Sequence, residues 1–109
     1  DVRDAVRAYY ILLNKKPRAG QFYNIGGNYS CTVGYMLKTL IKNSVYKNKI
    51  KIQKDKSRFR PIDANLQIPD TRKFRSHYDW KPQIKFKKTM IDLLNYWREK
   101  VSKNNFLDR

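Results

Sequence analysis

The sequence predicts a small mixed α/β domain of about four helices and two or three short strands. Two observations support this fold class. Several segments repeat apolar residues at helical spacing, and shorter segments between them combine aromatic and β-branched residues as buried strands do. The 109 residues fit one domain, which we place at 1–102, followed by a polar tail at 103–109. So few strands do not form a self-sufficient sheet, and we therefore expect the domain to dock against a larger unit.

Capping residues and apolar periodicity define the predicted helices. The helical segments are 1–15, with Asp1 as N-cap; a segment that follows the N-cap Thr32 and runs to Ile41; a short segment from its cap Asp70 to about Tyr78; and a segment from Phe86 with the apolar stripe Met90, Ile91, Leu94, Trp97 and Val101.

Strands are predicted at 21–25, 49–53 and 64–68. The first is rich in aromatic and β-branched residues. The second alternates lysine with isoleucine, which is typical of a strand with one buried face. Turns at Gly26-Gly27 and at 79–82 separate these elements from the helices.

The strongest feature of the composition is positive charge. The chain has 25 Lys and Arg against 9 Asp and Glu, a formal net charge of +16. Such a charge attracts nucleic acid, anionic lipid or a phosphorylated small molecule. A second explanation is an AT-rich genome, which over-supplies Lys, Asn, Ile and Tyr and so places lysine on a solvated surface. Charge alone does not choose between these explanations.

The sequence contains none of the common catalytic or metal-binding motifs. It has neither a G-x-x-x-x-G-K-[ST] loop nor a G-x-G-x-x-G fingerprint, for which Gly26-Gly27 is the nearest match. The lone Cys31 cannot form an internal disulfide, and with His77 it cannot assemble a structural zinc site, so we expect structural roles for both. No apolar run is long enough to span a bilayer and no leader is visible, so the expected location is cytoplasmic.

Three ordered segments carry a resemblance to a known family. The first is DVRDAVRAY at 1–9, and the second is FYNIG at 22–26. The third extends from RFRPID at 58–63 through IPDTRKF at 68–74 and WKPQIKF at 80–86 to LLNYWR at 93–98. Together they resemble GDP-mannose 4,6-dehydratases and GDP-4-keto-6-deoxymannose reductases, which are extended short-chain dehydrogenase/reductases of the NAD-dependent epimerase/dehydratase family.

The resemblance implies that this chain is the C-terminal, substrate-binding lobe of an extended Rossmann-type enzyme whose cofactor domain is absent. In the family, the N-terminal domain binds NADP or NAD and carries the Tyr-x-x-x-Lys catalytic pair. We therefore expect no cofactor site and no catalysis in this fragment alone. Expected partners are a GDP-sugar, the enzyme's own N-terminal Rossmann domain and, in the parent enzyme, further copies in a homodimer or homotetramer, without membrane or nucleic acid. Dehydratase, reductase and epimerase activities all remain open.

Arg60 and Asp63 are the predicted substrate-binding residues. The resemblance places Arg60 against the diphosphate of the GDP-sugar and Asp63 on the ribose hydroxyls. The chemistry agrees, because a guanidinium matches phosphate oxygens and a carboxylate accepts from vicinal hydroxyls. In the alternative reading, Arg60 is one of many basic surface residues and Asp63 forms a turn.

Two departures from the family pattern affect local structure. Asp79 replaces a glycine before Trp80, which predicts a left-handed backbone without glycine. Lys87 and Lys88 occupy the first turn of the last helix, where cations oppose the helix dipole. The alternative functions are a basic nucleic-acid-binding module and a standalone interaction domain.

Overall fold

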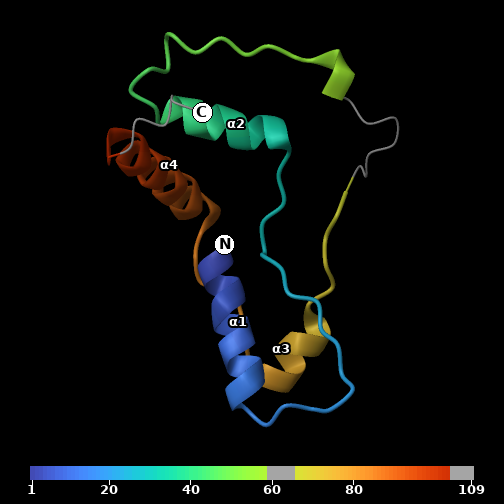
Figure 1. Ribbon diagram of the computed structural model, residues 1–109. Coiled ribbons are helices and arrows are strands. Elements are labelled where there is room, and N and C mark those ends of the chain that lie inside the picture. Colours follow the sequence, from blue (N-terminus) through green and yellow to red (C-terminus); the bar gives the residue numbers. More distant parts are fainter. Residues whose placement is uncertain (59–65, 104–109) are drawn as a thin grey trace.

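The computed structural model describes residues 1–58 and 66–103 (Figure 1). Its elements in chain order are the helices α1 (Val2–Asn14) and α2 (Val33–Lys42), the single 3-10 turn η1 (Lys56–Arg58), and the helices α3 (Arg72–Tyr78) and α4 (Phe86–Lys103). No helix in this described part is long and apolar enough to cross a membrane.

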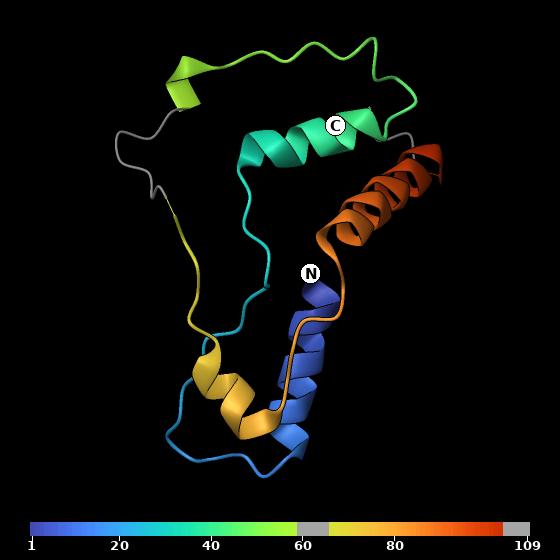
Figure 2. The ribbon, with the colours of Figure 1, turned by 180° about the vertical axis from the view of Figure 1, so that it is seen from behind.

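The helices form two pairs. α1 lies beside α3 at one end of the molecule, and α2 lies beside α4 at the other, as Figures 1 and 2 show from opposite sides. The molecule is extended, with principal dimensions of 51 × 38 × 27 Å and a radius of gyration of 18.1 Å. A compact domain of this length has a radius of gyration of roughly 13 Å. The long connections between the pairs account for the difference.

The helix N-termini follow the capping predicted from the sequence. Asp1 Oδ1 accepts from the Arg3 amide at 2.9 Å, and Thr32 Oγ1 accepts from the Tyr35 amide at 3.1 Å. Each bond satisfies an amide that the helix itself leaves without a partner. At α3 the N-cap position is Thr71, one residue later than predicted, and its side chain makes no capping bond.

The predicted α/β class is wrong, because the described residues form helices and no strands. Residues 21–25 run extended beside α3, and residues 50–53 run extended beyond α2, after a turn that ends at Lys49 (Figure 1). Residues 66–68 are irregular, and the first two residues of that predicted strand lie outside the described part. Strand propensity reflects packing on a pleated sheet, so it produces a strand only where another backbone supplies hydrogen bonds. These two extended segments are too far apart in the fold to pair.

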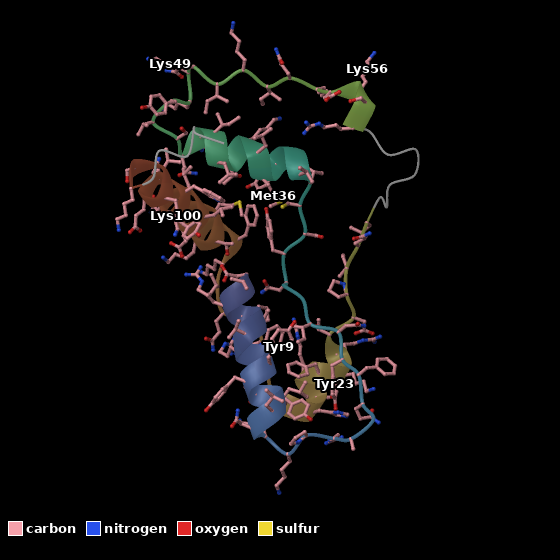
Figure 3. All side chains as sticks on the ribbon, viewed as in Figure 1. Tyr9, Tyr23, Met36, Lys49, Lys56 and Lys100 are labelled. Atoms are coloured by element: carbon pink, nitrogen blue, oxygen red, sulfur yellow. The ribbon has the colours of Figure 1, made fainter. Side chains whose placement is uncertain are left out.

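An aromatic core joins α1 to α3. Phe74 and Ala8 are 0% exposed, and Tyr78 and Trp80 are also buried. The rings of Phe74 and Trp80 meet edge to face with centroids 5.6 Å apart, and Phe74 meets Tyr23 in the same way at 5.4 Å. Trp80 therefore packs beneath the short helix α3. Figure 3 shows Tyr23 at the side of α3.

The two long helices bury less than their apolar stripes suggested. On α1, Val2, Val6 and Leu13 are all more than half exposed. On α4, Trp97 is 47% exposed and Val101 is 57% exposed. The core is therefore concentrated on α3 rather than distributed over the amphipathic helices.

The backbone at Asp79 adopts the left-handed conformation predicted from the missing glycine, with φ 45° and ψ 42°. Replacing Asp79 with glycine is expected to raise the free energy of unfolding by about 0.5–1 kcal/mol, because glycine adopts this conformation without a Cβ penalty. Urea unfolding measures the change. The matched variant Asp79→Ala also removes the carboxylate but keeps a Cβ, so it should give no gain. Equal gains in both variants would assign the effect to charge.

Candidate functional site

The two predicted substrate ligands, Arg60 and Asp63, lie outside the described residues. Their roles therefore stay predictions. The described chain ends before them at Arg58 of η1 and resumes after them at Leu66. The next residue, Gln67, lines a cavity.

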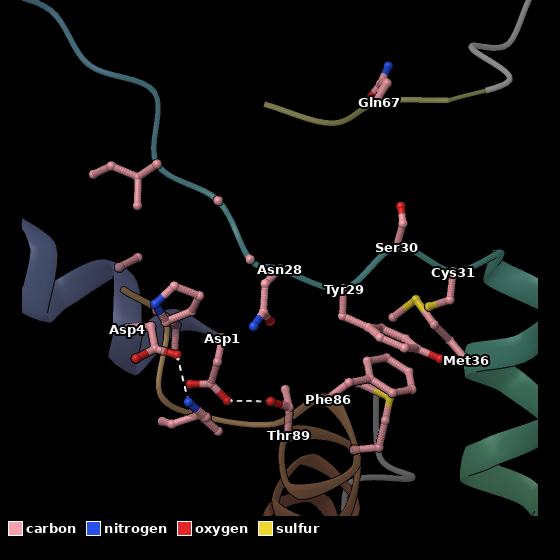
Figure 4. Close-up of a pocket in the computed structure, with 18 of the residues that line it drawn as sticks. Asp1, Asp4, Asn28, Tyr29, Ser30, Cys31, Met36, Gln67, Phe86 and Thr89 are labelled. Carbon is pink, nitrogen blue, oxygen red and sulfur yellow. Dashed lines mark hydrogen bonds between the residues drawn. The ribbon is translucent and has the colours of Figure 1, made fainter. Parts of the chain in front are cut away.

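The cavity has a volume of about 590 Å³, within the range of small-molecule sites. Its walls are the first residues of α1, the loop 25–31, alternate residues of 80–84 and the first turns of α4, with Met36 of α2 completing the apolar side. In the close-up of Figure 4, Gln67 lies across the opening from the loop. Four separate parts of the sequence thus line one cavity: residues 1–5, 25–36, 67 and 80–90.

One carboxylate of the cavity wall, Asp1, is fully engaged in joining α1 to α4. Its side chain is 4% exposed and pairs with Arg3 at 2.8 Å. The same carboxylate accepts from the Thr89 hydroxyl at 2.7 Å, as drawn in Figure 4. Arg3 in turn bonds Asp92 of α4 at 2.7 Å. This network fixes the angle at which α4 leaves the cavity.

The other carboxylate, Asp4, holds the segment before α4 against α1. It accepts from the backbone amides of Gln83 and Ile84 at 3.0 Å each, and from Arg7 at 2.8 Å. Burial by itself raises the pKa of Asp4. The bonds from Arg7 and from the two amides outweigh burial, and the resulting pKa lies below the usual 3.8. Asp4 is therefore a charged structural group and is not available as a proton donor or metal ligand.

The polar groups still free to meet a ligand are neutral. Asn28, Ser30 and Gln67 line the cavity, and the described residues offer their side chains no hydrogen-bond partner. Tyr29 and Phe86 form an aromatic wall, stacked with centroids 4.7 Å apart. No lysine or arginine of the described chain contributes to the lining. The cavity suits an uncharged ring bearing hydroxyl or amide groups better than it suits a phosphate.

Gly26 and Gly27 do not form a dinucleotide cradle. A Cβ on Gly26 would lie 2.2 Å from Pro69 Cγ, so the missing side chain makes room for the proline ring. A phosphate-binding glycine instead lets the backbone approach a ligand, which is not what Gly26 does here. The described residues also contain no group of three His, Cys, Asp or Glu that could hold a metal ion.

Gly26→Ala is expected to lower the free energy of unfolding by about 1–3 kcal/mol, because the proline ring cannot rotate away from the new methyl group. Gly27→Ala is the matched control. A Cβ there meets only the Tyr29 amide nitrogen, at 3.9 Å, so stability should be unchanged or raised by about 0.4–1 kcal/mol. Thermal or urea unfolding of both variants measures this. Equal stability in the two would contradict the packing of Gly26 on Pro69.

Cys31 and His77 differ in environment. Cys31 is an exposed free thiol that lines the cavity. His77 bonds the Tyr23 hydroxyl at 2.9 Å and therefore has a structural contact, as expected. The residue that sequence reasoning missed is Asp4. Its signal in the sequence was an aspartate one helical turn before Ala8, the buried alanine of α1.

Comparison with known proteins identifies the family. No curated protein matches the chain. The family model described as GDP-mannose 4,6 dehydratase matches residues 1–93, which is most of the chain. The match includes each of the segments with family resemblance except LLNYWR at 93–98, of which it includes only Leu93. The chain belongs to the GDP-mannose 4,6-dehydratase family.

Proposed function

We propose that this chain is the substrate-binding portion of an NAD(P)-dependent nucleotide-sugar dehydratase or reductase that acts on GDP-mannose or its 4-keto-6-deoxy product. The observation that carries the proposal is the family match over residues 1–93, which includes the RPID segment. In this proposal, the full enzyme exchanges a hydride between the cofactor and the hexose. A Rossmann-type domain outside these residues holds the cofactor.

Arg60 and Asp63 take complementary roles in the proposal. The cavity lining offers neutral polar groups but no cation, so a bound diphosphate needs a positive charge from another part of the chain. Arg60 supplies a planar guanidinium that can bond two phosphate oxygens at once. Asp63 accepts from the ribose hydroxyls. Gln67, four residues further along, already lines the cavity and so links this segment to the site.

Titration calorimetry of GDP-mannose into the full-length protein tests this function. Arg60→Ala is expected to weaken binding by about 10- to 150-fold, which corresponds to the loss of a charge-assisted contact of about 1.5–3 kcal/mol. Lys56→Ala is the matched control, since it removes one exposed cation from η1. Unchanged affinity in Arg60→Ala would remove this residue from the site. Absence of GDP-mannose binding by the unaltered protein would contradict the function itself.

A gel-shift experiment separates this function from the nucleic-acid alternative. The net charge of +16 will attract oligonucleotides at low salt by counterion release. In the proposed function this attraction disappears by about 0.2 M salt, whereas GDP-mannose binding persists. Tight oligonucleotide binding at that salt would favour the alternative.

A further inference from the structure

A second groove lies at the opposite end of α1 from the cavity. It has a volume of about 850 Å³ and is formed where the end of α1 and the following turn, 14–18, meet the end of α3 at 76–79. Both helix ends lie together at the lower end of the molecule in Figures 1 and 2. No residue of this groove contributes to the first cavity.

The lining of the groove is positively charged. Lys15, Lys16 and Arg18 contribute three cations, and Asp79 contributes the one carboxylate. The carbonyl ends of α1 and α3 offset about one further charge. A positive excess remains, because none of the three cations pairs with a carboxylate of the described chain.

Arg18 bonds a histidine in place of an acid. Its Nη1 lies 3.1 Å from His77 Nε2. Since a guanidinium can only donate, Nε2 is the accepting nitrogen and the His77 proton lies on Nδ1. Nδ1–H then donates to the Tyr23 hydroxyl oxygen, 2.9 Å away. His77 is thus held neutral at the edge of the groove. Its Nε2 faces the Arg18 guanidinium, whereas a protonated imidazole would favour an anion at that position.

The pKa of His77 agrees with the positive charge of the groove. Burial lowers the pKa of His77, and the charges of Arg18 and Lys73 lower it further below its ordinary 6.5. Lys73 lies over the Tyr23 ring with its Nζ 5.2 Å from the centroid. The other groups around the imidazole are the Tyr23 and Tyr78 rings and, in the groove lining, the Asp79 carboxylate.

We propose that this groove is a binding site for a phosphate-type oxyanion, held between Arg18 and the two lysines that follow α1. A tetrahedral anion beside Arg18 would accept from its guanidinium and from an ammonium group at the same time. Arg18 would then release His77 Nε2, which could take up a proton and donate it to the anion. This proposal uses none of the residues assigned to the proposed function and does not depend on it.

His77 is the one histidine of the chain, so its imidazole C2 proton gives a single NMR signal that reports on the site. The probe is inorganic sulfate, whose charge is constant between pH 5 and 8. At saturating sulfate we expect the midpoint of the His77 titration to rise by about 1 pH unit, as an adjacent anion favours the protonated imidazole. Sodium chloride at the same ionic strength should not reproduce the rise. An equal rise with chloride, or no rise with sulfate, overturns the proposal.

Substitutions test whether Arg18 and Lys16 bind the anion. Arg18→Gln keeps an amide donor for His77 but removes the charge, so the sulfate-dependent rise should be lost. Lys16→Gly should weaken the rise without loss of stability, because Lys16 has φ 47°, which glycine adopts freely. Arg58→Ala, which removes an exposed guanidinium from η1, is the matched control and should leave the rise intact. Equal losses in Arg18→Gln and Arg58→Ala would show a general effect of net charge and overturn the site.

Two further titrations identify the source of the anion. Inorganic phosphate and GDP are each added at pH 7, and the His77 signal is followed with concentration. A shift that GDP produces at lower concentration than inorganic phosphate assigns the groove to a nucleotide phosphate. A shift that inorganic phosphate produces as readily assigns it to the free ion. A response to neither contradicts the proposal.

Discussion

Replacing Asp4 with alanine is expected to lower the free energy of unfolding by about 3–5 kcal/mol, the usual loss when one partner of a buried ion pair is removed. The carboxylate of Asp4 is 4% exposed and accepts from Arg7 and from the amides of Gln83 and Ile84. Its loss leaves both amides without their acceptor and detaches the segment before α4 from α1. Urea unfolding monitored by circular dichroism measures the change.

Asp70→Ala is the control for Asp4→Ala. The bonds from the Arg72 side chain and amide lower the pKa of Asp70 to about 2, a large displacement. Both side chains are nevertheless exposed, so solvent screens their ion pair. Asp70→Ala should therefore destabilise the protein much less than Asp4→Ala. Equal losses from the two substitutions would show that the Asp4 network does not hold the fold together.

The bonds of Asp4 also predict that its contribution to the free energy of unfolding is lost in acid. The pKa of Asp4 is lower in the folded chain than its ordinary 3.8, so the folded state favours the ionised form. Its contribution to stability is fully present above that ordinary value and is lost as pH falls through the lower folded-state value. The stability difference between the unaltered protein and Asp4→Asn should therefore shrink as pH is lowered from 7 toward 2. A pH-independent difference would contradict the ionised state of Asp4.

Phe74→Ala is expected to lower the free energy of unfolding by about 3–5 kcal/mol, the usual cost of truncating a buried phenylalanine. Phe74 is 0% exposed, and its ring contacts those of Tyr23, Tyr78 and Trp80. Truncation leaves a cavity between α1 and α3 that the surrounding rings cannot fill. The near-ultraviolet circular dichroism of the packed aromatics should fall together with the unfolding midpoint.

Phe22→Ala is the matched control for Phe74→Ala. Phe22 is 80% exposed and lies in the same half of the molecule, beside the Lys73 ammonium. Its truncation should change the free energy of unfolding by about 0.5 kcal/mol or less. If both substitutions cost the same, the core is not centred on Phe74.

The helices and their caps could be read from the sequence because they depend on neighbours along the chain. Asp1 and Thr32 cap amides two and three residues away, and the left-handed backbone at Asp79 follows from a missing glycine at a helix end. The family resemblance was equally local, since it rests on ordered motifs, and the match over residues 1–93 confirms it. The predicted ligands Arg60 and Asp63 remain to be tested by binding.

What the tertiary structure decided is which surfaces meet. The sequence favoured the apolar stripe of α1, but the fold buries Asp4 and Ala8 and leaves Val2 and Leu13 exposed. Amphipathic periodicity states that a helix has an apolar face and does not state what covers it. The predicted strands failed for the same reason, because a strand exists only where a distant backbone pairs with it. Local chemistry thus determined the elements, and long-range contact alone determined the core, the cavity and the cationic groove.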